Sequence, residues 1–111
     1  MSMSHPTTVT ENPEASRYEI FVNGSLAGFS AYRDTESDVS PQRILHHTEV
    51  SEEYAGQGLA AILTREAVSA TIAGGRHVVP MCPYVKRWVA KHNVASDGID
   101  PVSSAHRALF D

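Results

Sequence analysis

Two glycines, Gly56 and Gly58, mark the stretch of this sequence best suited to bind a ligand. They lie in YAGQGLAAIL, between an apolar segment that ends at Val50 and a helical pattern that begins near Leu59. The first turn of a helix has unpaired N–H groups and a partial positive charge, and glycines let a large anion reach them. The corner is therefore a candidate pyrophosphate site, although both glycines could instead serve only a tight turn.

The single cysteine, Cys82, is a second candidate for chemistry. Pro83 suits the first turn of a helix, so the thiol should lie at a helix N-terminus with Tyr84 close by. That position favours the thiolate, which is the nucleophilic form of cysteine. A buried and inert cysteine is the alternative interpretation. A lone cysteine also excludes an internal disulfide, which fits a reducing compartment.

His46 and His47 end the segment before the glycines and could accept a proton near neutral pH. Neighbours in a strand point to opposite faces, so we expect that they do not act as a pair and that His47 shares a face with Glu49. A purely structural histidine is the alternative for each. No spacing of His, Cys and carboxylates suggests a metal site.

Charge and composition exclude several function classes. The 111 residues have a formal net charge of -4, which is unlike a nucleic-acid-binding domain. The sequence shows neither a signal peptide nor an apolar run long enough to span a membrane, so the expected location is the cytoplasm. Lys86, Arg87 and Lys91 are a local exception, and they could either contact a phosphate or form a solvated helix face.

The elements that must position these residues follow from the apolar pattern. Residues 17–32 alternate around Asn23-Gly24, which predicts a hairpin with a two-residue turn, and residues 42–50 predict a third antiparallel strand. A helical period then runs from Leu59 to the glycines at 74–75. A short buried strand at 76–82 and a helix from Pro83 complete the pattern.

This order predicts an α/β (α+β) fold in which a three-stranded meander joins a right-handed β-α-β crossover and a further helix. The strands at 42–50 and near 77–81 should be parallel. Residues 1–15 are rich in Ser, Thr, Pro and Glu, so we expect a disordered tail, with residues 16–111 forming a single domain. Residues 103–110 predict a short terminal helix.

Three ordered motifs resemble the GNAT N-acetyltransferase superfamily. YAGQGLAAIL is similar to its acetyl-CoA motif, Arg/Gln-x-x-Gly-x-Gly/Ala, in which Gly58 and Ala60 match and Ala55 departs. The HHTEV segment before this loop and VVPMCPYVKRWVAKH after the helix resemble the small YjdJ-type branch. The resemblance extends over residues 18–92.

The resemblance implies an acetyl-CoA-dependent acyltransferase that acetylates an amine of a peptide, protein or small molecule. The parallel strands would splay apart at Val50, pantetheine would lie between them, and a backbone N–H near Val50 would stabilise the oxyanion. The implied cofactor-binding residues are Val50, Gly56, Gln57, Gly58, Leu59 and Ala60, and the implied catalytic residues are Cys82, His47 and Tyr84. Whether Cys82 forms an acetyl-enzyme stays open.

The acceptor site should be shallow, since only a turn joins the first two strands of the meander. The alternative function is a non-catalytic module that binds CoA or a partner protein.

Overall fold

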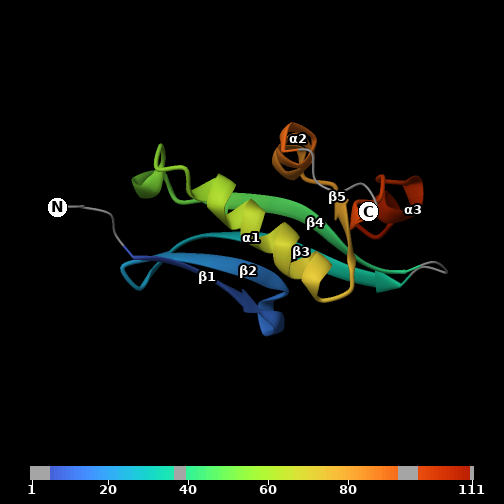
Figure 1. Cartoon of the computed structure of the whole chain (residues 1–111), viewed down its shortest axis with the longest axis horizontal. Helices are drawn as coiled ribbons and strands as arrows, with labels where there is room; N and C mark the ends of the chain where they lie inside the picture. Colours follow the sequence, from blue (N-terminus) through green and yellow to red (C-terminus); the bar gives the residue numbers. More distant parts are fainter. Residues whose placement is uncertain (1–5, 37–39, 93–97, 111) are drawn as a thin grey trace.

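The computed structural model describes residues 6–36, 40–92 and 98–110, which form a mixed sheet with helices packed on it (Figure 1). The strands are β1 (Thr7–Asn12), β2 (Arg17–Val22), β3 (Ser25–Glu36), β4 (Pro41–Val50) and β5 (His77–Pro80). The α-helices are α1 (Leu59–Ala73), α2 (Pro83–Lys91) and α3 (Ser104–Ala108), with 3-10 turns at Pro13–Ala15 and Glu52–Tyr54.

The sheet order is β1-β2-β3-β4-β5. Neighbouring strands are antiparallel except β4 and β5, which are parallel. The predicted α+β class and crossover are confirmed.

The hairpin between β2 and β3 forms where the sequence predicts it. Asn23 and Gly24 both have positive φ, 51° and 80°, as a type I′ turn requires. The helix in the C-terminal segment is also present, and Ser103 caps it by accepting from the His106 N–H.

The predicted disordered tail at residues 1–15 is wrong for its second half. Residues 7–12 form β1, which pairs antiparallel with β2 along its whole length. The strand is mostly polar because it lies at the sheet edge, and only Val9 packs against the core. Glu11 also accepts a hydrogen bond from Tyr32 of β3, and Asn12 donates one to Glu19 of β2. Residues 1–5 lie outside the described part of the chain.

Helix α1 covers one face of the sheet. Its buried side chains include Leu59, Leu63, Ala67 and Val68, which join the core. Ala70, which the sequence pattern places on this face, is exposed, because Val68 and Thr71 fill the space against the strands. The helix ends at Gly74, and the following Gly75 has a φ of 86°.

Helix α3 lies on the face of the sheet opposite α1. Along β4, Arg43 and Leu45 point toward α1, since Arg43 bonds Tyr18, which in turn bonds Thr71 of α1. The alternate residue Gln42 points the other way and bonds His106 of α3. The two faces of β4 are therefore covered by different helices.

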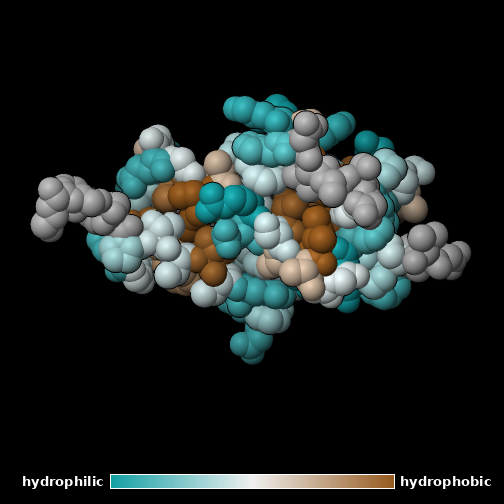
Figure 2. Space-filling model, viewed as in Figure 1, coloured by the Kyte–Doolittle hydropathy of each residue, from teal (hydrophilic) through white to brown (hydrophobic). Residues whose placement is uncertain are grey.

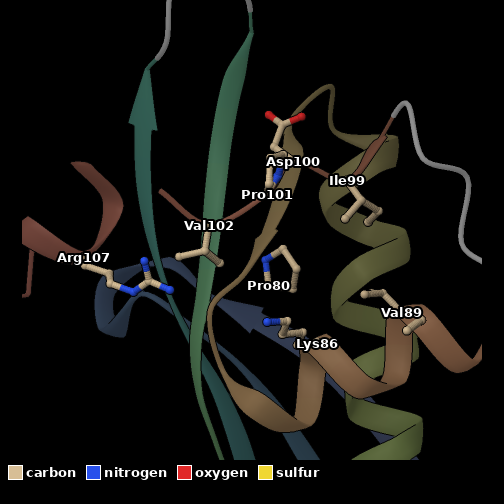
Figure 3. A pocket seen from close by; sticks show the side chains of 9 residues that line it. Pro80, Lys86, Val89, Ile99, Asp100, Pro101, Val102 and Arg107 are labelled. Carbon is tan, nitrogen blue, oxygen red and sulfur yellow. The ribbon is translucent and has the colours of Figure 1, made fainter. Parts of the chain in front are cut away.

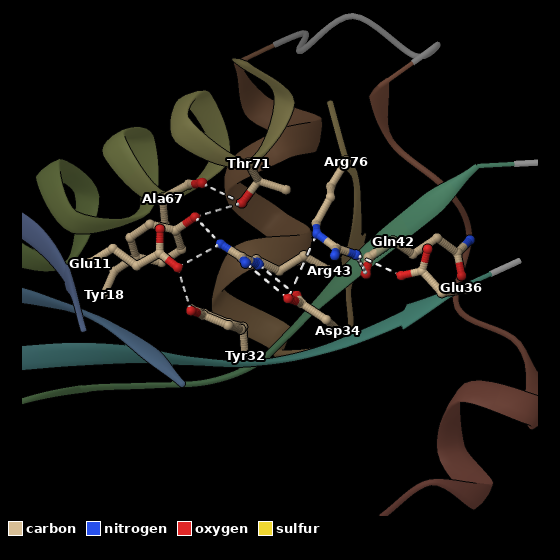
Figure 4. A network of polar contacts seen from close by, with 10 residues as sticks. All are labelled: Glu11, Tyr18, Tyr32, Asp34, Glu36, Gln42, Arg43, Ala67, Thr71 and Arg76. Carbon is tan, nitrogen blue, oxygen red and sulfur yellow. Dashed lines mark hydrogen bonds and ion pairs between the residues drawn. The ribbon is translucent and has the colours of Figure 1, made fainter. Parts of the chain in front are cut away.

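A network of polar side chains fixes the first half of β4 on the α1 side (Figure 4). The Arg43 guanidinium makes two hydrogen bonds to Asp34, at 2.6 and 2.9 Å, and one of 2.7 Å to the Tyr18 hydroxyl. It also lies 3.8 Å from the ring centroid of Tyr32, whose hydroxyl donates to Glu11. Burial and the bond to Glu11 raise the pKa of Tyr32 above its ordinary value. This network joins β1, β2, β3, β4 and α1.

Gly28 lets β3 come unusually close to the end of β4. A Cβ built on Gly28 would overlap the carbonyl oxygen of Glu49 and would lie 3.1 Å from the Cα of Val50. The neighbouring Ala27 accepts a hydrogen bond from the Ser51 N–H at 2.8 Å. A glycine inside a strand permits this close approach of the two backbones, which any other residue at this position would prevent.

The face of the molecule that carries α1 is not uniformly polar. Figure 2 shows two apolar patches on it, one over the N-terminal end of α1 and one beside its C-terminal half. Among the residues that the structure describes, no helix combines the length and the apolar character that crossing a membrane would require.

Candidate functional site

The central feature of the candidate site is the separation of β4 from β5. The two strands pair only from Gln42 with His77 to Leu45 with Pro80. Pro80 has no N–H, and the N–H groups of Met81 and Cys82 both donate to the Leu45 carbonyl, at 3.1 and 2.9 Å. Within the described ranges, no backbone hydrogen bond joins the rest of β4, residues 46–50, to the segment after β5. The strands are therefore unpaired at Val50, where the resemblance implied that they splay apart, and their pairing already ends at Leu45.

The glycine corner lies beside this free edge. Gly56 and Gly58 have φ values of 80° and 73°, which disfavour any residue with a side chain. A Cβ at either position would meet no atom within 4 Å, so the space over both glycines is open. Gly58 is the N-cap of α1, and its carbonyl accepts the first intrahelical bond from Ile62 at 3.3 Å.

The first turn of α1 therefore offers N–H groups for a ligand. Residues 59–61 precede the first intrahelical donor, no side chain caps the helix, and its first turn contains no acidic residue. A cavity of about 160 Å³ opens over this turn and is lined by Val50, Tyr54, Gly56, Gly58, Ala60 and Tyr84, among others. The positive end of the helix dipole faces this cavity, which is suited to an anion.

A second cavity continues from the first along α1 and α2. It has a volume of about 390 Å³ and shares Ala61 and Tyr84 with the first. Its other lining residues are Arg87, Trp88, Lys91 and His92, and the last turn of α2 stacks the His92 ring on Trp88 at 4.4 Å between centroids. The cavity thus combines two cations with a flat aromatic surface. Lys86, which the sequence groups with these cations, points to a different cavity.

Cys82 lies at the N-cap of α2, where Pro83 is the first helical residue, as predicted. The side chain is buried, with a relative exposure of 6%. Its Sγ donates to the Thr48 hydroxyl at 3.5 Å, so the thiol lies across the gap between β4 and α2. Thr48 was not singled out by the sequence, because no local pattern shows which residue of β4 would face Cys82.

The prediction that His46 and His47 point to opposite faces is wrong. The register of β3 and β4 shifts between Ala31 with His47 and Tyr32 with Leu45, so His46 is the extra residue of a bulge. His46 stacks on Phe110, which follows α3, and His47 lies 5.8 Å from the ring of Phe29.

Both imidazoles therefore lie on the side of the sheet away from α1. Burial and the neighbouring His47 lower the pKa of His46. His47 is 55% exposed and bonds Glu49 at 3.3 Å, which confirms the shared face of these two residues. Cys82 and Thr48 are on the other side of the strand, so the structure does not bring His47 to Cys82.

The other predicted site residues converge at the splay. Val50 ends the free edge, Leu59 and Ala60 form the first turn of α1, and Tyr84 lines both cavities. Gln57 is exposed between the two glycines. In the described ranges, no group of three or more His, Cys, Asp or Glu residues is placed to hold a metal ion.

Solved structures share this fold. The chain is similar to an integron cassette protein from the mobile metagenome of V. cholerae, with a TM-score of 0.54 and 16% identity. It is also similar to a ribosomal-protein-alanine N-acetyltransferase from Brucella melitensis biovar Abortus 2308, with a TM-score of 0.54 and 21% identity. The alignments cover 79% and 71% of this chain, which spans only 56% and 61% of those two chains. No curated protein matches the sequence.

A family model gives the more direct assignment. The model described as GCN5-related N-acetyl-transferase matches residues 17–97, which is well over half of the chain. The matched range contains β2 to α2, and with them the splay, the glycine corner and Cys82. The chain therefore belongs to the GCN5-related N-acetyltransferase family.

Proposed function

We propose that this protein uses acetyl-CoA to acetylate an amine of a peptide, protein or small molecule. Family membership supports acetyl transfer in general. The observation that carries the proposal is the free edge of β4 at residues 46–50, which leads directly to the open N-terminus of α1. An extended chain with amide groups can pair with the first, and a pyrophosphate can bind at the second.

Each part of acetyl-CoA has a corresponding surface. The pyrophosphate would accept hydrogen bonds from the N–H groups of residues 58–60, with Gly56 and Gln57 forming the loop beside it. Pantetheine would pair with the backbone near Val50. The nucleotide would occupy the cavity next to it, where Arg87 and Lys91 can neutralise the 3′-phosphate and Trp88 offers a ring for the base.

The reaction needs an attacking amine, a stabilised oxyanion and a proton for the leaving thiolate. The amine nitrogen attacks the thioester carbonyl, a backbone N–H near Val50 stabilises the oxyanion, and the C–S bond breaks to release CoA. Tyr84 lines the cavity beside the splay and is our candidate proton donor to the CoA thiolate. His47 is the candidate base for an amine that approaches from the face away from α1.

One route for the reaction begins with Cys82. Its thiolate would attack the thioester, CoA would leave as the thiol, and the amine would then take the acetyl group from Cys82. The contact with Thr48 orients the Cys82 sulfur toward the gap in which the thioester would lie. Direct attack by the amine, with Cys82 packed against pantetheine, is the other route.

A non-catalytic module that binds CoA is the second candidate function. Two observations favour it. Ala55 departs from the acetyl-CoA motif, and His47 lies on the opposite side of the sheet from Cys82. Turnover of acetyl-CoA with a panel of amines separates the two functions, since only an enzyme releases CoA in proportion to the amine consumed.

The proposed binding mode is tested by calorimetry on two valine variants. Gly58→Val places a branched side chain over the first turn of α1 and should abolish measurable CoA binding. Gly75→Val imposes similar backbone strain, because Gly75 also has a positive φ, but it lies at the far end of α1. It should therefore retain the wild-type affinity for CoA. Equal affinity of Gly58→Val and wild type would refute the pyrophosphate site.

A further inference from the structure

A third cavity, with a volume of about 490 Å³, lies between α2 and the C-terminal segment (Figure 3). It is separate from the proposed cofactor groove, since it uses the side of α2 that carries Lys86 and Val89. The segment beside it is tied to β5, where the Asp100 N–H donates to the Val78 carbonyl at 2.8 Å. Its walls are largely apolar and are formed by Pro80, Val89, Ile99, Pro101 and Val102.

Two cations face this cavity from different elements. Figure 3 shows the side chains of Lys86, on α2, and Arg107, on α3, pointing toward each other across Val102 and Pro80. Across the described parts of the chain, no carboxylate forms an ion pair with either one. The carboxylate at the cavity rim, Asp100, is already bonded to Gln42 at 2.7 Å and to His77 at 3.0 Å. The cavity therefore presents positive charge beside apolar walls.

The cavity is also close to the proposed reacting group. Pro80 precedes Cys82 by two residues, and the Lys86 N–H donates to the Cys82 carbonyl at 2.9 Å, one helical turn later. The two ends of this short segment line the cavity, while Cys82 itself faces the splay. One turn of α2 thus connects the cavity to the Cys82 corner.

We infer that this cavity holds the acetyl acceptor and selects amines that carry a carboxylate and an apolar side chain, such as free apolar amino acids. The inference depends on the proposed acetyltransferase function. The carboxylate would bind between Lys86 and Arg107, and the apolar side chain would lie against Val89 and Val102. The amine would then form the new C–N bond, its proton would go to a base, and CoA would leave as the thiol. Such a site would select its substrate by charge and by apolar contact, unlike the shallow and open acceptor site that the sequence suggested.

The specificity test compares leucine with leucinamide, which differ in the carboxylate alone. The ratio of their kcat/KM values is measured in wild type and in Lys86→Met/Arg107→Met, which cancels the intrinsic reactivity of the two amines. The double variant should lower the leucine-to-leucinamide ratio roughly tenfold or more, the effect of losing hydrogen bonds to a charged group. The rate with leucinamide and the affinity for CoA should stay near wild type. Arg65→Met removes an exposed cation of α1 and should leave the ratio unchanged.

A binding experiment separates this inference from the proposed function. Shifts in amide NMR signals with N-acetylleucine and N-acetylleucinamide need no turnover. N-acetylleucine should shift Lys86, Val89 and Arg107 more strongly than its amide does, and the double variant should remove the difference. An unchanged preference in the double variant, or equal shifts with the two ligands, overturns the acceptor site. If the wild type neither binds CoA nor turns over acetyl-CoA but still prefers N-acetylleucine to its amide, the acetyltransferase function alone is overturned.

Discussion

The two halves of β4 belong to one strand but have different surroundings. Residues 41–45 pair with β3 on one edge and β5 on the other, and Arg43 also bonds Glu11 of β1 and Tyr18 of β2. Residues 46–50 pair with β3 only, and a bulge at His46 separates them from the first half. The comparison shows how a small sheet can present unpaired backbone to a ligand: the strand is held firmly at one end, so the other end keeps its position without a second partner.

The largest expected effect comes from removing the thiol of Cys82, which lies beside the unpaired residues 46–50 of β4. Cys82→Ala should lower kcat by roughly a hundredfold or more, the scale of losing a positioned catalytic group. Intact-mass measurement after mixing with acetyl-CoA should show one added acetyl group on the wild type and none on the variant. The matched control Thr48→Val removes the contact to Cys82 but keeps the thiol, so its loss of activity should be much smaller.

This prediction has a clear opposite outcome. Full activity of Cys82→Ala, together with a wild-type thiol that does not react with iodoacetamide, would leave only a packing role for the cysteine. The second half of β4 would then supply backbone for binding and no covalent chemistry.

The next largest effect is on the free energy of unfolding and concerns residues 41–45 of β4, which Arg43 anchors. Arg43→Met leaves Asp34 and Glu11 without their common cation, and we expect the free energy of unfolding to fall by about 2 kcal/mol. Urea unfolding followed by circular dichroism measures it. Arg76→Met is the control, because Arg76 pairs with the exposed Glu36 and lies 3.7 Å from Asp34, so its loss should cost less than about 1 kcal/mol. Equal losses in the two variants would contradict the anchoring role of Arg43.

The smallest effect is the pH dependence of the tie between the first half of β4 and the C-terminal segment. Burial opposes ionisation of Asp100, but hydrogen bonds from Gln42 and His77 outweigh it and lower the pKa of this carboxyl. A lowered pKa means that Asp100 stabilises the fold fully above its ordinary pKa of about 4, and that this contribution is lost as the pH falls through the folded-state value.

Asp100→Asn removes this dependence. The difference in unfolding free energy between wild type and variant should be constant from pH 7 to 5 and should shrink toward pH 3. A difference that stays the same at pH 3 would show that the charge of Asp100 does not hold the segment.

The sequence predicted the parts of the fold that depend on local patterns. Asn23-Gly24 specified the hairpin, Gly58 and Gly74 bounded α1, and Pro83 opened α2. It failed where partners distant in the chain decide the outcome. The sequence of β1 looks like a polar tail because it has no apolar alternation. The strand is held in place by its pairing with β2 at the sheet edge.

The candidate site shows the same division. The glycine corner and Cys82 could be found from residue types and spacing alone. The bulge at His46 could not, since it depends on the register between two strands, and it moved both histidines to one face. Lys86 and Arg87 are neighbours in sequence yet line different cavities, because adjacent helical positions point about 100° apart.

Gly28 supports the free end of β4 from its other edge, where β4 pairs with β3. It brings β3 against the backbone of Glu49 and Val50, and thereby sets how far the end of β4 is drawn back from α2. Any side chain at this position would act as a wedge and push the strand end toward the gap. The absence of a Cβ at Gly28, on β3, thus helps to set the width of the gap in which an extended ligand would lie.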